Sequence, residues 1–387
     1  MKWPLMVDCL SYTDKERLIR FIHESDRYTQ GALTKEFEKR WSQWLGTSYS
    51  VFVSSGSAAN LLILSAIKEL YFKCTTPTIL TSVCTWATNI SSCIQMGYRL
   101  AFADISTEDF GIDLSGVKDE DVDVIFATHI MGIPSNIEAM RERFPNAIIV
   151  EDCCESHGAV YKGARVGTHG KASSFSFYFG HHMTTVEGGM ISTDDKELFN
   201  LLKAKRSHGM IRDMDDDVKE KYIKENPDID PRFLFITDGF NARSSDIAAL
   251  IGISQLERLS AGVEVRKENH ARFEAVLAKY GENFSLPSSQ GNSSFCFPFI
   301  CKDRDTRDAL KALFEEKGVE TRPFLVGNIM RQPYMKGYTS PSTPNADVMH
   351  EQAFYIGNNP FLTDDHFELL EETLDEYFNM HNNQGQR

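Results

Sequence analysis

The sequence predicts an α/β protein of two domains: a large domain built on a mostly parallel mixed sheet, and a smaller C-terminal α/β domain. Two observations favour this architecture. The chain has 387 residues, of which 42% are hydrophobic, which is more than one compact domain usually holds. Short β-rich runs alternate with longer amphipathic runs through the first part of the chain, a pattern typical of a sheet covered by helices. We expect the large domain at residues 1–250 and the small domain at residues 251–387.

Five β-rich runs predict the strands of the large sheet, and stretches with helical spacing predict the helices between them. Phe37, Trp41 and Trp44 fall near one face of the helix expected at Lys35–Trp44. Catalytic groups in such folds gather at the carboxyl ends of the strands, so the residues after each run are the first candidates. The expected strands are Ser50–Val53, Thr78–Thr81, Leu100–Ala103, Val122–Thr128 and Ala147–Val150, and two further helices are expected at Ala58–Leu70 and Ala87–Met96.

The C-terminal part of the chain begins after a charged stretch, Met210–Pro231, which has little apolar periodicity and predicts a surface excursion. One strand is expected in this part, at Phe295–Cys301. The expected helices are Ser245–Leu259, Val265–Tyr280, Arg307–Lys317 and His366–Met380.

The composition argues against several classes of partner. The formal net charge is −14 and the acids are spread along the chain, which disfavours nucleic acid and anionic membranes as partners. No stretch approaches about 18 uninterrupted apolar residues, the length of a membrane-spanning helix. The eight cysteines show neither metal-ligand nor disulfide spacing. We therefore expect a soluble, cytoplasmic protein with reduced thiols and no metal.

Small and polar residues follow three of the expected strands. Ser54–Ala58 ends a strand and opens a helix, so its backbone N–H groups and hydroxyls could hold a phosphate, although an ordinary turn with a serine cap has the same pattern. Asp152 follows another strand and could pair with a protonated pyridine nitrogen, or could cap a helix. Trp86 could stack on a flat ring, or could belong to the core.

The segment Ser174–Gly189 indicates that these residues share one function. The order of Ser-Gly-Ser, aromatic residue, Asp, Phe-Ser-Phe and Glu-Gly-Gly resembles that of the DegT/DnrJ/EryC1/StrS sugar aminotransferases, over nearly the whole chain. The resemblance implies a type I fold of pyridoxal-phosphate enzymes, like that of aspartate aminotransferase. In that family a lysine between Phe-Ser-Phe and Glu-Gly-Gly bonds covalently to the cofactor. His181 occupies this position here.

A histidine cannot replace the lysine amine, but it can move protons near pH 7. The resemblance points to the histidine-bearing branch of the family, the nucleotide-sugar 3-dehydratases, which hold pyridoxal or pyridoxamine phosphate (PLP or PMP) non-covalently. In that branch His181 would remove a proton from the cofactor, and the C3 hydroxyl of GDP-4-keto-6-deoxy-D-mannose would leave. Ammonia would be released, and L-glutamate would regenerate PMP. The iron–sulfur members of the branch are disfavoured because a Cys-x-Cys-x-Cys cluster is missing.

The family motifs imply a role for each matching residue. Asn241 would reach the phosphate from the other subunit, so the protein would be a homodimer with shared active sites. His181 would be the catalytic residue, and His182 would be structural or would support from behind the residues that touch the cofactor. The remaining expected roles are phosphate binding by Ser55, Gly56, Ser57 and Ser176, ring and nitrogen contacts by Trp86 and Asp152, contact near the pyridine hydroxyl by Glu155, and substrate contacts by His208, Arg212 and Arg322.

Other functions fit the same residues. The chain could be a nucleotide-sugar 4-aminotransferase whose lysine has been lost or replaced, although Phe-Gly-His-His departs from the lysine-bearing pattern at more than one position. It could act on a CDP-, UDP- or dTDP-linked sugar, because no motif read here fixes the base. It could also be an inactive fold that binds a nucleotide sugar or a partner protein.

Overall fold

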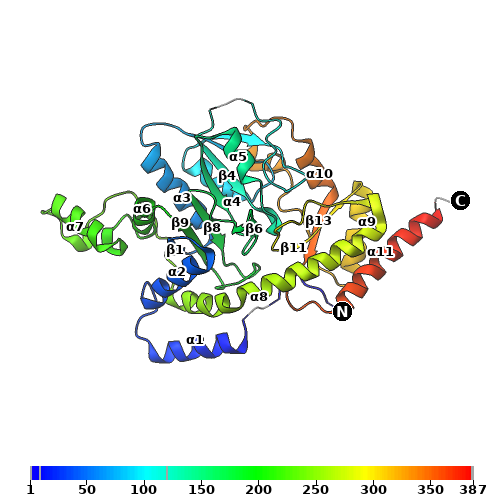
Figure 1. Cartoon of the computed structure of the whole chain (residues 1–387), viewed down its shortest axis with the longest axis horizontal. Helices are drawn as coiled ribbons and strands as arrows, with labels where there is room; N and C mark the ends of the chain where they lie inside the picture. Colours follow the sequence, from blue (N-terminus) through cyan, green and yellow to red (C-terminus); the bar gives the residue numbers. More distant parts are fainter. Residues whose placement is uncertain (1, 8–9, 119–120, 385–387) are drawn as a thin grey trace.

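A seven-stranded sheet forms the centre of the molecule in this computed structural model, which describes residues 2–7, 10–118 and 121–384 (Figure 1). The strand order is β1-β9-β8-β5-β4-β2-β3. Among the described strands of this sheet, β9 alone runs antiparallel to its neighbours, which confirms the predicted mostly parallel arrangement. The strands are β1 (Tyr49–Val53), β2 (Thr78–Ser82), β3 (Arg99–Ala103), β4 (Val124–Thr128), β5 (Ile148–Asp152), β8 (Ala172–Ser176) and β9 (Gly189–Thr193).

Helices cover both faces of this sheet, and the alternation of side chains along β1 shows how. Val51 and Val53 belong to a core shared with α3 (Gly56–Tyr71) and α6 (Lys196–Arg206). Phe52 points the opposite way, into a core shared with α2 (Ala32–Leu45) and α8 (Asp246–Leu277). Every residue of β2, β8 and β9 is buried, as expected for strands covered on both faces. The other helices beside the sheet are α4 (Ala87–Gln95) and α5 (Ile137–Arg143), and a short hairpin is formed by β6 (Val160–Tyr161) and β7 (Ala164–Arg165).

Helix α8 corrects one expectation from the sequence. The two helices expected at Ser245–Leu259 and Val265–Tyr280 form one continuous helix of 32 residues, capped by the hydroxyl of Ser245. The stretch between them contains no proline, and the single Gly262 costs a helix only about 1 kcal/mol, which tertiary packing offsets. The expected domain division after residue 250 falls inside this helix, and it stays a prediction.

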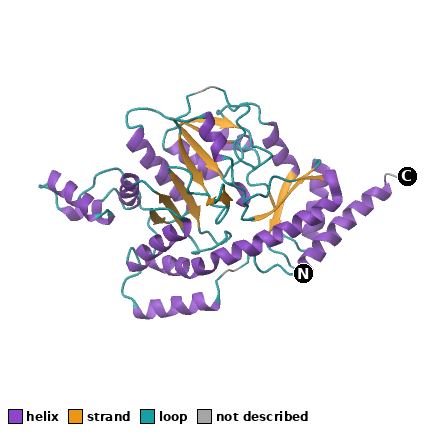
Figure 2. Ribbon diagram, viewed as in Figure 1, coloured by secondary structure: helices purple, strands orange, loops and turns teal. Residues whose placement is uncertain are grey.

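A second, antiparallel sheet lies in the C-terminal part, beside the large one (Figure 2). Its strand order is β10-β11-β13-β12, and Phe354 and Ile356 on its outer face pack against α9 and α11. Residues on its inner face, such as Cys296 and Ala353, pack with residues of the large domain such as Ile90 and Ile130. The elements are β10 (Phe284–Ser285), β11 (Cys296–Cys301), α9 (Arg304–Glu316), β12 (Thr321–Pro323), α10 (Pro344–Gln352), β13 (Ala353–Gly357) and α11 (Asp364–Gln384).

Two helices lie at the periphery. Helix α7 (Asp216–Glu225) projects from one end of the molecule, and none of its residues is buried, which confirms the surface excursion predicted there (Figure 1). Helix α1 (Tyr12–Glu24), which the sequence analysis did not predict, exposes Tyr12 and Ile19. No helix within the described ranges is long and apolar enough to cross a membrane. Seven cysteines are free thiols, and Cys9 lies outside the described residues.

Candidate active site

A cavity of about 360 Å³ lies where the carboxyl ends of β1, β2, β4, β5 and β8 meet the inner face of the C-terminal sheet. Its volume is in the range of ordinary small-molecule sites. The large domain contributes Ser55, Gly56, Ser57, Asn60, Trp86, Thr88, Asn89, Thr128, Asp152, Cys154, Glu155, Ser176, Tyr178, His181 and Glu187, while Met6, Phe295, Leu325 and Tyr355 come from the two ends of the chain.

The N-terminus of α3 forms one wall of the cavity. Ser55 is the N-cap residue, and its hydroxyl accepts a hydrogen bond of 3.0 Å from the N–H of Ala58. A Cβ atom on Gly56 would lie 2.7 Å from both Cys154 Sγ and Ser176 Cβ, so no larger residue fits there without displacement. The free N–H groups and the helix dipole make this wall suitable for an anion such as a phosphate.

Asp152 is the last residue of β5, and its side chain is 3% exposed. Its Oδ2 atom accepts hydrogen bonds from Asn89 Nδ2 at 2.6 Å and from Asn60 Nδ2 at 3.2 Å. Its Oδ1 atom accepts one from the N–H of Cys154 at 2.9 Å. These neutral donors fix the carboxylate without neutralising it, so its charge is available to a cation in the cavity.

Trp86 precedes helix α4, and its side chain is 52% exposed although it borders the cavity. An indole with one free face can stack on a flat ring. The neighbouring wall is held by a hydrogen bond of 2.8 Å between the hydroxyls of Ser57 and Thr88, which joins the starts of α3 and α4.

Glu155 has an unusual carboxyl group. Burial raises its pKa to about 7, and Asp152 adds to this shift, while a hydrogen bond of 3.0 Å from the N–H of Met131 opposes it. Met131 donates this bond from a left-handed backbone conformation with φ of 56°. Near neutral pH Glu155 therefore exists in both protonation states and can donate or accept a hydrogen bond.

His181 lies in the turn between β8 and β9, and its ring centroid is 5.5 Å from that of Phe295. Burial lowers the pKa of His181 to about 4, and the positive charge of Arg266 adds to the shift. The ring is therefore neutral at physiological pH and can accept a proton. Among the described residues that line the cavity, none is a lysine.

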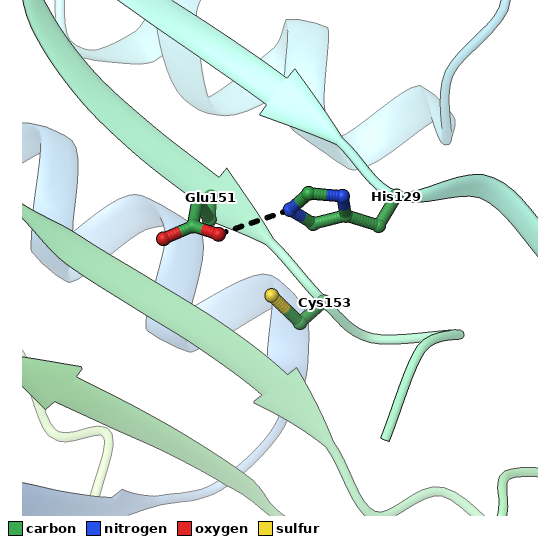
Figure 3. A group of neighbouring side chains, drawn as sticks. All are labelled: His129, Glu151 and Cys153. Atoms are coloured by element: carbon green, nitrogen blue, oxygen red, sulfur yellow. Dashed lines mark hydrogen bonds and ion pairs between the residues drawn. The ribbon is translucent and has the colours of Figure 1, made fainter. Parts of the chain in front are cut away.

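A second group of side chains, His129, Glu151 and Cys153, has the composition of a metal site, but His129 and Glu151 are saturated by internal hydrogen bonds. His129 donates from Nε2 to Glu151 Oε2 at 3.1 Å, and its Nδ1 accepts the N–H of Ser135 at 2.9 Å (Figure 3). Glu151 also accepts backbone N–H groups of Gly167, His169 and Gly170. Their lone pairs are engaged, so these residues fix the loop after β7 rather than offer ligands to an ion.

Comparison with known proteins places the chain in a family. The model of the DegT/DnrJ/EryC1/StrS aminotransferase family matches residues 11–374. The chain belongs to this family.

Members of the DegT/DnrJ/EryC1/StrS family resemble the chain along most of its length. GDP-4-keto-6-deoxy-D-mannose 3-dehydratase of Yersinia pseudotuberculosis is 32% identical over 368 residues, which are 90% of this chain and 92% of that protein. A solved structure of GDP-4-keto-6-deoxymannose 3-dehydratase, a histidine-to-asparagine mutant with bound GDP-perosamine, has a TM-score of 0.89 at 28% identity, and the match covers 96% of this chain and 100% of that one. The Escherichia coli enzyme with bound hydrated PLP has a TM-score of 0.87 at 27% identity, with coverage of 97% and 99%. The predicted PLP-enzyme fold is confirmed.

Eight residues singled out from the family motifs line the cavity, and four do not. Asn241 and His208 lie together at the end of α6, where Arg243 donates hydrogen bonds to Asn241 Oδ1 at 3.1 Å and to His208 Nε2 at 3.3 Å. Arg212 is exposed beside a separate polar hollow between α2 and α6. Arg322 is exposed and pairs with Glu320 at 3.0 Å. Their expected roles stay predictions.

Several cavity residues were not predicted from the sequence. Asn60 and Asn89, the two amides that hold Asp152, are buried polar residues in the first turns of helices α3 and α4. A buried asparagine directly after a strand-to-helix turn was a usable signal. Phe295, Leu325 and Tyr355 reach the cavity only through the packing of the two sheets, which no local pattern reveals.

Proposed function

We propose that this protein is a PLP/PMP-dependent 3-dehydratase of a nucleotide-linked 4-keto-6-deoxy sugar, and that its substrate is GDP-4-keto-6-deoxy-D-mannose. One observation carries the proposal. His181, instead of a lysine, stands between the Phe-Ser-Phe and Glu-Gly-Gly runs and borders a cavity whose described lining contains no lysine. The described lining of this cavity thus offers no primary amine to bond the cofactor covalently, which argues against the aminotransferase alternative.

The cavity residues fit PLP or PMP. Gly56 and the start of α3 would receive the phosphate: the absence of a Cβ lets Cys154 and Ser176 pack closely against this wall, and the first N–H groups of the helix would be the donors. Asp152 would pair with the protonated pyridine nitrogen, and Trp86 would cover a ring face. Glu155 would meet the pyridine hydroxyl, and Ser57 and Ser176 would add donors to the phosphate. The bound cofactor supplies an electron sink for bond cleavage at the sugar.

His181 would act as the proton carrier of the reaction. Its lowered pKa keeps the imidazole neutral at physiological pH, so it begins the cycle able to accept a proton. After it has accepted one, the imidazolium can donate that proton to the departing C3 hydroxyl, which leaves as water. Desolvation and the charge of Arg266 lower the pKa of His181, which makes the imidazolium a better proton donor than a free one and favours this second transfer.

The similar proteins support the substrate. The relative from Yersinia is named for GDP-4-keto-6-deoxy-D-mannose, and the structure with a TM-score of 0.89 holds GDP-perosamine, a GDP-linked sugar. L-Glutamate would regenerate PMP, and ammonia would be released with the 3-deoxy-4-keto sugar. The C-terminal part would face the sugar with Leu325, which follows β12, and with Tyr355 of β13, both of which line the cavity.

A homodimer with shared active sites is part of the proposal. Asn241 and His208 lie together on the surface and outside this chain's own cavity, so their family roles require the partner subunit. Phe233 and Phe235 are 62% and 51% exposed in the segment that leads to Asn241. Large exposed apolar side chains mark interaction surfaces.

The half-reaction with glutamate tests whether the fold is an active enzyme. Protein incubated with PLP and L-glutamate should convert the cofactor to PMP, which is followed by its absorbance, and release 2-oxoglutarate in equal amount. The His181→Asn variant should bind PLP and give no conversion. A wild-type protein that binds PLP but never forms PMP would contradict the proposed function and favour an inactive fold.

A further inference from the structure

Three imidazole rings meet behind the active-site cavity. The ring centroid of His157 lies 6.1 Å from that of His181 and 5.4 Å from that of His182, with interplanar angles of 34° and 37°. His157 follows β5, and the other two histidines stand in the turn after β8. From the sequence we expect His182 to be structural or to support from behind the residues that touch the cofactor, and we assign no role to His157.

Several ring nitrogens of these three histidines lack a hydrogen-bond partner in the part of the chain that the structure describes. Within the cluster, four buried ring nitrogens have no hydrogen-bond partner among the described residues: both nitrogens of His157, Nδ1 of His181 and Nδ1 of His182. The carbonyl of Ser176 lies close enough to His157 to favour its protonated form, although the geometry falls short of a hydrogen bond. A buried polar atom left unsatisfied costs about 1–3 kcal/mol, so four of them in one place require an explanation.

The tautomer of His182 is fixed by its other nitrogen. Nε2 lies 3.0 Å from the carbonyl oxygen of Ser293, which can only accept, so Nε2 carries the proton. Burial keeps the pKa of His182 well below its usual value, and Arg266 adds to the effect, so the ring is neutral. Its Nδ1 is therefore a lone-pair acceptor that faces the cluster.

The tautomer of His181 decides whether it can work as a base toward the cavity. Nδ1 is its buried nitrogen, so Nε2 is the nitrogen available to the cavity. For Nε2 to hold a lone pair, the single proton of the neutral ring must lie on Nδ1. That proton needs an acceptor on the buried side, because a buried donor without one is unfavourable.

We infer that His157 and His182 are positioning residues for His181, joined to it by one internal water molecule. The water accepts the Nδ1 proton of His181 and donates its two protons to Nδ1 of His182 and to one nitrogen of His157. The other His157 nitrogen then carries a proton and points to the Ser176 carbonyl. This single arrangement satisfies the four nitrogens and gives the water three partners, the usual number for a buried water. None of the four nitrogens makes a direct hydrogen bond to another ring among the described residues, and centroid separations of 5.4 and 6.1 Å place the rings within reach of one shared water.

The test reads the tautomer of His181 directly and needs no turnover. In protein labelled with ¹⁵N-histidine, long-range proton–nitrogen correlations distinguish Nδ1–H from Nε2–H, and His181→Asn identifies the His181 signals. We expect Nδ1–H for His181 and Nε2–H for His182 in the wild-type protein. A wild-type His181 that carries its proton on Nε2 overturns the inference, whatever any variant does.

Substitution of His157 tests whether this residue fixes the tautomer of His181. His157→Phe keeps a flat ring and removes both nitrogens, so the Nε2–H tautomer of His181 should become populated. On the proposed function, kcat should fall about 10-fold to 100-fold with KM little changed, the scale for groups that orient a functional histidine. His157→Gln keeps an acceptor and should restore part of both properties. His366→Phe is the control, since His366 lies in the first turn of α11, with its ring centroid 5.2 Å from that of Trp3 and a hydrogen bond to Thr363, away from the cluster. It should leave the His181 tautomer unchanged.

The two proposals can fail separately. If His157→Phe leaves both the His181 tautomer and kcat as in the wild type, the positioning role is wrong. If the tautomer changes as expected while the wild-type protein shows no dehydratase activity, the positioning role stands and the proposed function fails.

Discussion

Asn89 donates a hydrogen bond of 2.6 Å from its side-chain amide to Oδ2 of Asp152, and thereby joins the first turn of α4 to the end of β5. Asn60 of α3 donates to the same oxygen at 3.2 Å. The carboxylate is thus held by two helices that follow two different strands of the sheet, β1 and β2. A bound pyridine would be oriented by α3, α4 and β5, which also form part of the cavity wall.

Asp152→Asn should impair the enzyme severely. The new amide cannot pair with a protonated pyridine nitrogen, and its NH₂ group would face the two amide donors if it took the position of Oδ2. We expect kcat to fall by at least about 100-fold, the scale for loss of one preorganised electrostatic partner. Steady-state kinetics and titration of PLP absorbance measure the effect. Asp303→Asn is the control, because Asp303 caps the distant helix α9 and asparagine caps equally well. Equal kinetics for both variants would contradict the assigned role of Asp152.

Gly56→Ala should weaken cofactor binding and destabilise the protein. Its Cβ would lie 2.7 Å from Cys154 Sγ and from Ser176 Cβ, so the wall of the phosphate site must shift. We expect a loss of about 1–3 kcal/mol in the free energy of unfolding, as for other overpacked sites. Denaturant unfolding and PLP titration check this. Gly116→Ala introduces the same methyl group into open space and should change neither quantity. Unchanged PLP affinity in Gly56→Ala would place the phosphate elsewhere.

Glu155→Gln should change how stability depends on pH. Burial raises the folded-state pKa of Glu155 to about 7, above its ordinary value of 4.5, so the folded protein binds this proton more tightly than the unfolded chain. The resulting stability is present below pH 4.5 and is lost as the pH rises through 7. Glutamine does not titrate, so between pH 5 and pH 8 the free energy of unfolding of the variant should rise by about 1–2 kcal/mol relative to that of the wild type. A pKa shift is worth about 1.4 kcal/mol per unit, and the partial exposure of Glu155 reduces that value. If the wild type and Glu155→Gln, both without cofactor, show the same dependence of the free energy of unfolding on pH, this pKa is contradicted.

Subunit complementation should reveal shared sites. Asp152→Asn and Asn241→Ala should each be impaired alone. In a mixed dimer one site combines the intact Asp152 of one subunit with the intact Asn241 of the other. Random reassociation should therefore restore roughly a quarter of wild-type activity, because half the dimers are mixed and each has one good site. Activity that never exceeds the sum of the two variants would place Asn241 outside the partner's site.

Much of the large domain and its cavity could be predicted from the sequence. Residues after β1, β2, β5 and β8 meet because the carboxyl ends of parallel strands share one edge of the sheet. Gly56, Trp86, Asp152 and His181 therefore line one cavity although they are far apart in the chain.

Other features of the fold could not be predicted from the sequence, for physical reasons. Strand β8 (Ala172–Ser176) contains three serines, and β9 (Gly189–Thr193) begins with a glycine and has only two β-branched residues, so neither has the β-branched run that predicts a strand. Tyr355 reaches the cavity because residues alternate along β13: Phe354 and Ile356 point to α9 and α11, and Tyr355 points toward the large domain. That direction depends on how the two sheets pack. The continuity of α8 likewise depends on contacts along its length rather than on the residues near Gly262.

The identity of the product tests the central claim most directly. Protein supplied with PLP, L-glutamate and GDP-4-keto-6-deoxy-D-mannose should release ammonia and form a GDP-linked 3-deoxy sugar, measured by an ammonia assay and mass spectrometry. His181→Asn should bind PLP and form neither product. An amino sugar as the sole product, with no ammonia released, would contradict the dehydratase and show that the chain transfers nitrogen without a lysine.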